Sequence, residues 1–177
     1  MLLNRRRILL GLAGGGLAAL VRPGRLHSAA SELIEMRGTP RGERVWFSPL
    51  GVAVAPGTTV RFANRDRVNS HTVTAYHPDV LGRPRRIPVG AEHWHSGFLL
   101  PQEVFEVTLT RPGVYDYYCL PHERAGMVGR IVVGGPGDHG WQPAARSPEG
   151  LPPAAANNLP PVAVIFAAGR VNREAAS

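Results

Sequence analysis

The chain has 177 residues, enough for one ordinary domain with tails, and its formal net charge is +7. Five arginines fall in the first thirty residues, whereas residues 31–177 hold fifteen basic and thirteen acidic residues. This near balance excludes the basic surface of a nucleic-acid-binding protein. The single cysteine excludes an internal disulfide, so the domain must be stable through its core.

The first thirty residues resemble a twin-arginine export signal. Residues 4–9 read Asn-Arg-Arg-Arg-Ile-Leu, and the apolar segment 8–21 that follows is shorter than the roughly 20 residues that span a bilayer. Residues 28–30, Ser-Ala-Ala, offer a cleavage site. We therefore expect residues 1–30 to be a signal peptide and the mature protein to be periplasmic or secreted, without stable membrane insertion. An uncleaved membrane anchor is the alternative.

Short apolar or alternating runs, separated by turns such as Pro56-Gly57, follow one another through the middle of the chain. Val60 and Phe62 alternate with polar residues and are expected on one buried face. The expected strands are residues 33–36, 45–47, 52–54, 58–63, 71–76, 104–109, 114–118 and 129–133. Short strands at this spacing predict an all-β sandwich. The stretch 77–101 contains four prolines and is expected to be irregular.

The composition changes after Gly134, where a tail rich in proline, alanine and glycine begins. One apolar run, residues 162–168, interrupts this tail. Exposed apolar surface of that extent is uncommon in soluble proteins, so we expect the run to add an edge strand to the sandwich. The alternative for residues 135–177 is a tail that is partly disordered.

One loop carries three soft metal-ligand side chains. Cys119 ends an expected strand, His122 follows three residues later and Met127 five residues after that. A lone cysteine is usually a small buried hydrophobe, and a lone histidine or methionine also has a simpler explanation. Together, a thiolate, an imidazole and a thioether favour copper, and a second histidine would complete the ligand set of a blue-copper site. His71, which opens an expected strand, can supply that histidine.

These residues give the chain its resemblance to the cupredoxins, closest to the plastocyanin, pseudoazurin and amicyanin group, over roughly residues 31–134. The family pattern is an upstream His followed by Cys-x-x-His-x-x-x-x-Met, here His71, Cys119, His122 and Met127. Segments 56–64 and 126–133 also resemble the family. The resemblance implies an eight-stranded Greek-key β-sandwich with one type 1 copper ion, held by two histidines and a cysteine in a plane with methionine as a weak axial ligand. It further implies that Asn64 ties the two ligand loops together, a turn role being the alternative.

The stretch 77–101 is longer than in the small members of that family. His93 and His95 alternate along the chain and could bind a second metal, with a plain surface loop as the alternative. Arg83, Arg85 and Arg86 could steer an acidic redox partner or form a solvated face.

The expected function is the transport of single electrons between redox partners, such as a cytochrome or a copper enzyme, by a monomeric protein that is not an enzyme. A binuclear copper centre would need two cysteines, and a multicopper oxidase or copper nitrite reductase would need histidines from a second domain. A cysteine-nucleophile enzyme would leave Met127 unexplained. The alternative is a periplasmic protein that binds or delivers copper without an electron-transfer role.

Overall fold

Two β-sheets form the body of the protein, and the computed structural model describes them within residues 30–173. The first sheet has the strand order β2-β1-β4-β6 and the second has the order β5-β7-β8-β3-β9. The strands are β1 (Ser31–Gly38), β2 (Val45–Ser48), β3 (Gly51–Val54), β4 (Thr58–Asn64), β5 (Thr74–Ala75), β6 (Val104–Leu109), β7 (Gly113–Tyr118), β8 (Val128–Val133) and β9 (Arg170–Val171). The expected all-β sandwich is confirmed. The expected signal peptide lies outside the described residues.

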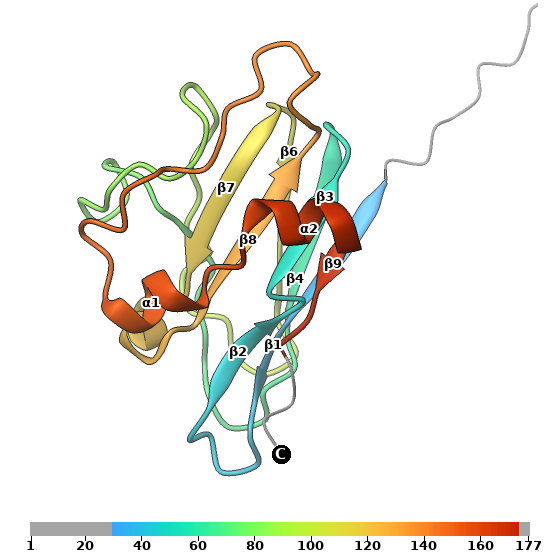
Figure 1. Ribbon diagram of the computed structural model, residues 1–177. Helices are drawn as coiled ribbons and strands as arrows, with labels where there is room; N and C mark the ends of the chain where they lie inside the picture. Colours follow the sequence, from blue (N-terminus) through green and yellow to red (C-terminus); the bar gives the residue numbers. More distant parts are fainter. Residues whose placement is uncertain (1–29, 174–177) are drawn as a thin grey trace, which may run out of the picture.

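The chain alternates between the two sheets, and this alternation joins them. β1 and β2 pair in an antiparallel manner in the first sheet, β3 belongs to the second sheet, and β4 returns to pair in parallel with β1. β3 is in turn parallel to β8, its neighbour in the second sheet. Neighbours in a sheet are therefore often distant in sequence, so residues from separate segments meet at the ends of the sandwich (Figure 1).

The core lies between the sheets and follows the alternation of the sequence. Val60 and Phe62 are fully buried, as expected. Phe47, Phe62 and Tyr117 pack edge to face across the core, with ring centroids 4.8–6.4 Å apart. Aromatic pairs in this geometry add about 0.5–1.5 kcal/mol each beyond the burial of their surface.

The expected strand 71–76 is largely interrupted, and only Thr74 and Ala75 form the short strand β5. His71 makes an isolated bridge with Leu99, and Thr74 makes one with His95. The partner segment, residues 94–99, contains Gly97 with a φ of 68°, so its backbone is not extended throughout and pairs only through isolated bridges.

The apolar run 162–168 forms helix α2 (Val162–Ala168), so the strand expected there is wrong. Pro160 and Pro161 come directly before it, and proline is favoured at a helix start because its missing N–H has no partner there. Ile165 packs on Val114 and Val132, while Val164 and Phe166 are partly exposed. An edge strand does follow: β9 pairs with β3 over two residues.

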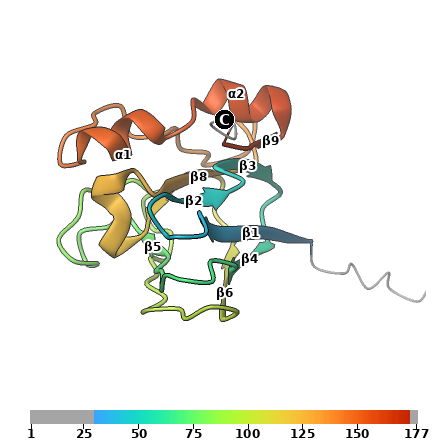
Figure 2. The ribbon, with the colours of Figure 1, turned by 90° about the horizontal axis from the view of Figure 1, so that it is seen from below.

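A second short helix, α1 (Pro153–Asn158), precedes α2. Figure 2 shows both helices on the outer side of β8 and β3, away from β4 and β6. α1 packs against the 3₁₀ helix η1 (Leu120–Ala125), which follows β7 (Figure 1). Within residues 30–173, no helix is both long and apolar enough to cross a membrane.

Candidate metal centre

The loop between β7 and β8 folds back so that its ends meet. The backbone N–H of Cys119 donates to the carbonyl of Met127 at 3.0 Å, and that of Met127 donates to the carbonyl of His122 at 3.1 Å. Between them, η1 has Pro121 as its second residue and is followed by Gly126, whose φ of 81° lies in the left-handed region that favours glycine. This turn places Nδ1 of His122 3.3 Å from Sγ of Cys119.

His71, from a distant segment of the chain, also lies beside the sulfur of Cys119. Its bridge with Leu99 holds the backbone through hydrogen bonds of 3.1 and 2.7 Å. Nδ1 of His71 lies 3.6 Å from Sγ of Cys119, and the ligand atoms of His71, Cys119 and His122 all lie within 4.8 Å of one another. The structure thus brings together three of the four predicted residues through their ligand atoms.

Met127, the fourth predicted residue, is fully buried in the core cluster that also contains Cys119. Its backbone bonds to both Cys119 and His122 keep it beside them. Two imidazoles, a thiol and a thioether at one protected point make a soft nitrogen-and-sulfur donor set, which suits copper.

A direct link between the two ligand segments comes from Thr72, not from Asn64. The backbone N–H of Thr72 lies 3.3 Å from Sγ of Cys119, and its hydroxyl accepts from the backbone N–H of Leu120 at 2.7 Å. Asn64 instead donates to the carbonyls of Asn69 and Leu99 at 3.0 and 2.9 Å. Asn64 therefore connects the segment before His71 with the segment that pairs with His71. The expected link from Asn64 between the two ligand loops is not found in the part of the chain that the structure describes.

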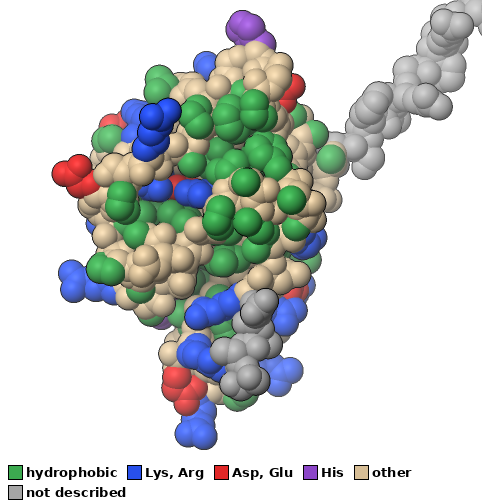
Figure 3. Space-filling view, viewed as in Figure 1, with side chains coloured by type: hydrophobic (Ala, Val, Ile, Leu, Met, Phe, Trp, Pro, Cys, Tyr) green, Lys and Arg blue, Asp and Glu red, His purple; other side chains and the backbone are tan. Residues whose placement is uncertain are grey.

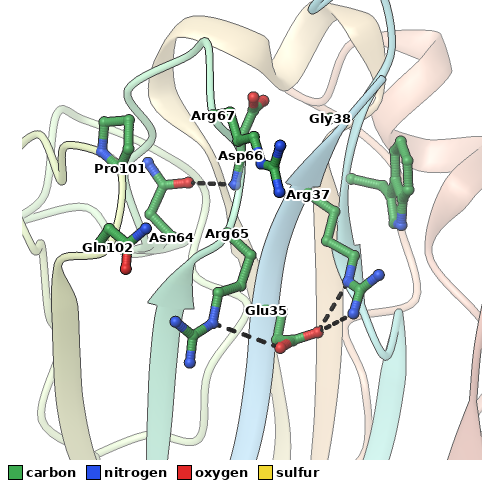
Figure 4. Close-up of a pocket in the computed structure, with 10 residues that line it drawn as sticks. Glu35, Arg37, Gly38, Asn64, Arg65, Asp66, Arg67, Pro101 and Gln102 are labelled. Carbon is green, nitrogen blue, oxygen red and sulfur yellow. Dashed lines mark hydrogen bonds and ion pairs between the residues drawn. The ribbon is translucent and has the colours of Figure 1, made fainter. Parts of the chain in front are cut away.

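Asp66 is a buried residue of the site that sequence reasoning missed. Its Oδ2 lies 3.0 Å from Nε2 of His71, and both side chains are almost completely buried. Asn64 orients the loop by accepting from the backbone N–H of Asp66 (Figure 4). β1 passes so close to the carboxylate that a Cβ on Gly38 would overlap Oδ2. The only signal in the sequence was an acidic residue five positions before the predicted histidine.

The protonation of His71 follows from this contact. Hydrogen bonds from Asn69, Val68 and His71 lower the pKa of Asp66, although burial opposes them, so the carboxylate is ionised near neutral pH and can only accept. Nε2 of His71 therefore carries the proton, and the lone pair of Nδ1 points towards Cys119. A carboxylate bonded to the far nitrogen of an imidazole is a common way of orienting a metal ligand.

Burial sets the other pKa values at the site. It lowers the pKa of His71 and of His122, so both rings are neutral donors at neutral pH. It also raises the pKa of the Cys119 thiol to about 11, although hydrogen bonds from Thr72 and His122 oppose the effect of burial. The thiolate that a metal needs must therefore be formed as the metal binds.

Side chains of the stretch 76–83 bond to the ligand loop through Glu123. Glu123, on η1, accepts from the hydroxyl of Tyr76 at 2.8 Å and from the guanidinium of Arg83. Tyr76 stacks on Tyr118, the residue before Cys119, with ring centroids 4.4 Å apart. Arg83 is thus engaged with the ligand loop and Arg86 is buried, so of the three arginines considered for partner steering only Arg85 is exposed.

A second group, His77, Asp79 and His93, also has ligand atoms within 4.8 Å of one another. The two imidazoles stack with centroids 4.6 Å apart and planes only 19° apart. A ring nitrogen binds metal in the plane of its ring, so parallel stacked rings direct their lone pairs side by side and not at one point. In addition, Nδ1 of His77 accepts from the backbone N–H of Asp79 at 3.1 Å. By contrast, the rings of the metal centre are tilted by 57°.

The expected pair of His93 and His95 is divided between two different contacts. His93 stacks on His77, whereas Nδ1 of His95 is 2.8 Å from the hydroxyl of Thr74. Neither contact presents two free imidazole nitrogens to one ion.

Comparison with known proteins agrees with this geometry. The family model described as copper binding proteins, plastocyanin/azurin family, matches residues 34–134. Chloroplastic plastocyanin of Oryza sativa subsp. indica is 32% identical over 127 residues, which are 72% of this chain and 80% of that protein. Pseudoazurin of Paracoccus pantotrophus is 33% identical over 125 residues, covering 71% and 76% of the two chains.

Among solved structures, a pseudoazurin from Sinorhizobium meliltoi is 32% identical with a TM-score of 0.45, covering 60% of this chain and 76% of that one. The family model alone spans more than half of the chain and includes every residue of the metal centre. The chain therefore belongs to the plastocyanin/azurin family of copper-binding proteins, with a cupredoxin fold and copper as its cofactor.

Proposed function

We propose that this protein carries single electrons on one type 1 copper ion held by His71, Cys119, His122 and Met127. The observation that supports this most strongly is the convergence of two imidazole Nδ1 atoms on the Cys119 sulfur, at 3.6 and 3.3 Å, in a buried place. Bound copper would supply a one-electron couple between Cu(I) and Cu(II), which is the use of such a ligand set in blue-copper proteins.

The protein's own contribution is a frame that keeps the donors in place. His71 is held by Asp66 at one nitrogen and by Leu99 through its backbone, and His122 is held by the closed loop around Gly126. A frame fixed before the metal arrives moves little when the charge of the ion changes, which favours fast electron exchange. His71, Cys119 and Met127 are fully buried, so the site leaves no open face for a substrate. We therefore propose that the protein is not an enzyme.

His122 is the most exposed of the four residues and offers the route for the electron. Large apolar side chains are exposed on the segments around it: Leu120 is 39% exposed, Phe98 61% and Leu100 58%. An apolar rim of this kind suits brief docking of a redox protein, because little charge must lose its water. We propose that a cytochrome or a copper enzyme docks there and that the carrier is a monomer.

Stopped-flow mixing with a reduced c-type cytochrome tests the proposal. Leu120→Asp should leave the visible spectrum unchanged and lower the second-order rate constant roughly tenfold, the effect of about 1.4 kcal/mol. Leu33→Asp is a matched control, because Leu33 is also 39% exposed but lies in the first half of β1. A slow rate that is equal in all three proteins would instead favour a copper-delivery protein.

We further propose that the protein is exported by its first thirty residues and works in the periplasm or outside the cell. The support is the sequence pattern of residues 4–9 and 28–30. Replacing Arg5 and Arg6 together by lysine should keep the protein in the cytoplasm at its full length. N-terminal sequencing of the exported wild type should begin within a few residues of Ser31, and export of the double variant at the wild-type level would contradict the proposal.

A further inference from the structure

A buried ionic cluster lies between the sandwich and the C-terminal segment. Asp116, on β7, accepts from Nε of Arg86 at 2.9 Å and from Nε and Nη2 of Arg130 at 2.6 and 3.0 Å. Nη1 of each guanidinium donates to the C-terminal segment: Arg86 to the carbonyl of Ser147 and Arg130 to the carbonyl of Pro160. The cluster thus fastens this segment to the second sheet.

The positive charge of this cluster is not balanced. Two guanidiniums face one carboxylate, and the side chains of Arg86 and Arg130 are only 5% and 8% exposed. Among the described residues, Nη2 of Arg86 has no hydrogen-bond acceptor. A buried charge is costly unless another charge compensates it.

A hollow of about 390 Å³ opens beside these arginines. Arg86, Arg130 and Arg146 line it, together with Asn157 and the apolar residues Pro148, Leu151, Ala156 and Leu159. No acidic side chain is among these lining residues, and Arg146 makes no ion pair within residues 30–173. Figure 3 shows basic and acidic side chains together in a depression on the face that carries α1 and α2, bordered by hydrophobic groups. A neighbouring hollow is lined by the exposed Glu149 together with Arg85, Arg86 and Arg146.

We propose that this hollow binds a small dianionic oxyanion with the chemistry of phosphate or sulfate. Three guanidiniums and one carboxylate leave two positive charges, which a dianion neutralises. Guanidinium groups are well suited to such a ligand, because their planar N–H groups can pair with two of its oxygens. The apolar walls reduce the competition from water, which strengthens the interaction.

The site would act on the C-terminal segment, which supplies six of the eight residues that line the hollow. α1 contributes Ala156 and Asn157, and the next residue, Asn158, donates to the carbonyl of Gly126 in the ligand loop at 2.9 Å. An anion held by Arg146 and the buried pair would fix the segment against η1. This inference is independent of copper, so its failure would leave the proposed electron transfer untouched.

The test is calorimetric titration of the copper-loaded protein with sodium phosphate and sodium sulfate, with ionic strength held constant by sodium chloride. We expect saturable binding of one anion per chain. Arg146→Gln, at an exposed position, should weaken the affinity roughly tenfold or more, since a hydrogen bond to a charged group is lost. Arg41→Gln removes the same charge from an exposed position outside the hollow and should bind like the wild type.

Ala156→Leu provides a second variant, which narrows the hollow while every charge remains. It should also weaken binding, and an unchanged visible spectrum of each variant will show that the metal centre is intact. Equal affinity in the wild type and Arg146→Gln, or an equal loss in Arg41→Gln, would overturn the assignment. So would the lack of saturation, or acetate binding as tightly as sulfate.

Discussion

Asp66→Asn is the substitution that examines the environment of His71 most closely. The carboxylate accepts four hydrogen bonds: from the backbone N–H groups of Val68 and Asn69 at 2.9 and 3.3 Å, from the Asn69 side chain at 2.9 Å, and from His71 at 3.0 Å. Asparagine offers one oxygen, so in either orientation two of these donors face an NH₂ group. A buried donor without an acceptor costs about 1–3 kcal/mol, so the loss of two acceptors should lower the unfolding free energy of the copper-free protein by about 2–6 kcal/mol.

The same substitution should raise the reduction potential of the copper. Cu(II) carries one more positive charge than Cu(I), so a nearby carboxylate stabilises the oxidised form, and one imidazole ring separates Asp66 from the proposed copper position. A unit charge at roughly 8 Å contributes about 2 kcal/mol at an effective dielectric constant of about 20. For one electron this corresponds to about 90 mV, and partial screening leaves an expected rise of several tens of millivolts.

Denaturant unfolding of the copper-free protein and voltammetry of the copper-loaded protein measure the two effects. Asp79→Asn is the matched control, because it removes the same charge at an exposed position. If Asp66→Asn and Asp79→Asn have the same potential as the wild type, the carboxylate does not act on the copper and the reasoning is refuted. A lower potential in Asp66→Asn would refute it as well.

Three further results are expected. Ile165→Ala should cost about 2–4 kcal/mol of unfolding free energy, because Ile165 is fully buried between α2 and the second sheet. Val164→Ala, at a position 46% exposed, should cost less than about 0.5 kcal/mol. Equal losses in chemical denaturation would show that α2 does not pack as described. Copper binding at pH 7.5 should release about one proton, because the Cys119 thiol has a pKa of about 11 while His71 and His122 are already neutral. Titration calorimetry in buffers of different ionisation enthalpy measures the number of protons released, and a value of zero would contradict the prediction. The copper-free protein should lose stability as the pH falls below about 6.5, the ordinary pKa of histidine in an unfolded chain. The pKa values of His71 and His122 are lower in the folded protein, so the unfolded chain binds protons first. Unfolding free energies that do not change between pH 7.5 and 5 would refute this prediction.

The sequence was sufficient for those features that depend on local spacing. Alternation correctly predicted that Val60 and Phe62 are buried, and the spacing from Cys119 to Met127 identified the ligand loop. Their agreement with the structure has a simple cause: a strand repeats every two residues, and a short loop between paired strands must bring its two ends together.

Features that depend on distant packing could not be predicted in the same way. Nothing in the charged sequence of residues 64–67 indicates burial, yet Asp66 is buried, because Gly38 lies against its carboxylate and His71 is within 3.0 Å of it. The run 162–168 was misassigned, because seven apolar residues fit a helix or a strand equally well by pattern alone. Pro160 and Pro161, directly before this run, are the signal for a helix start in the sequence.

The visible absorption spectrum of the copper-loaded protein, recorded beside that of Cys119→Ser, tests the central claim most directly. A copper–thiolate bond at Cys119 predicts strong visible absorption in the wild type and its loss in the serine variant. A colourless wild type, or a variant with an unchanged spectrum, would contradict a type 1 copper site built on this sulfur.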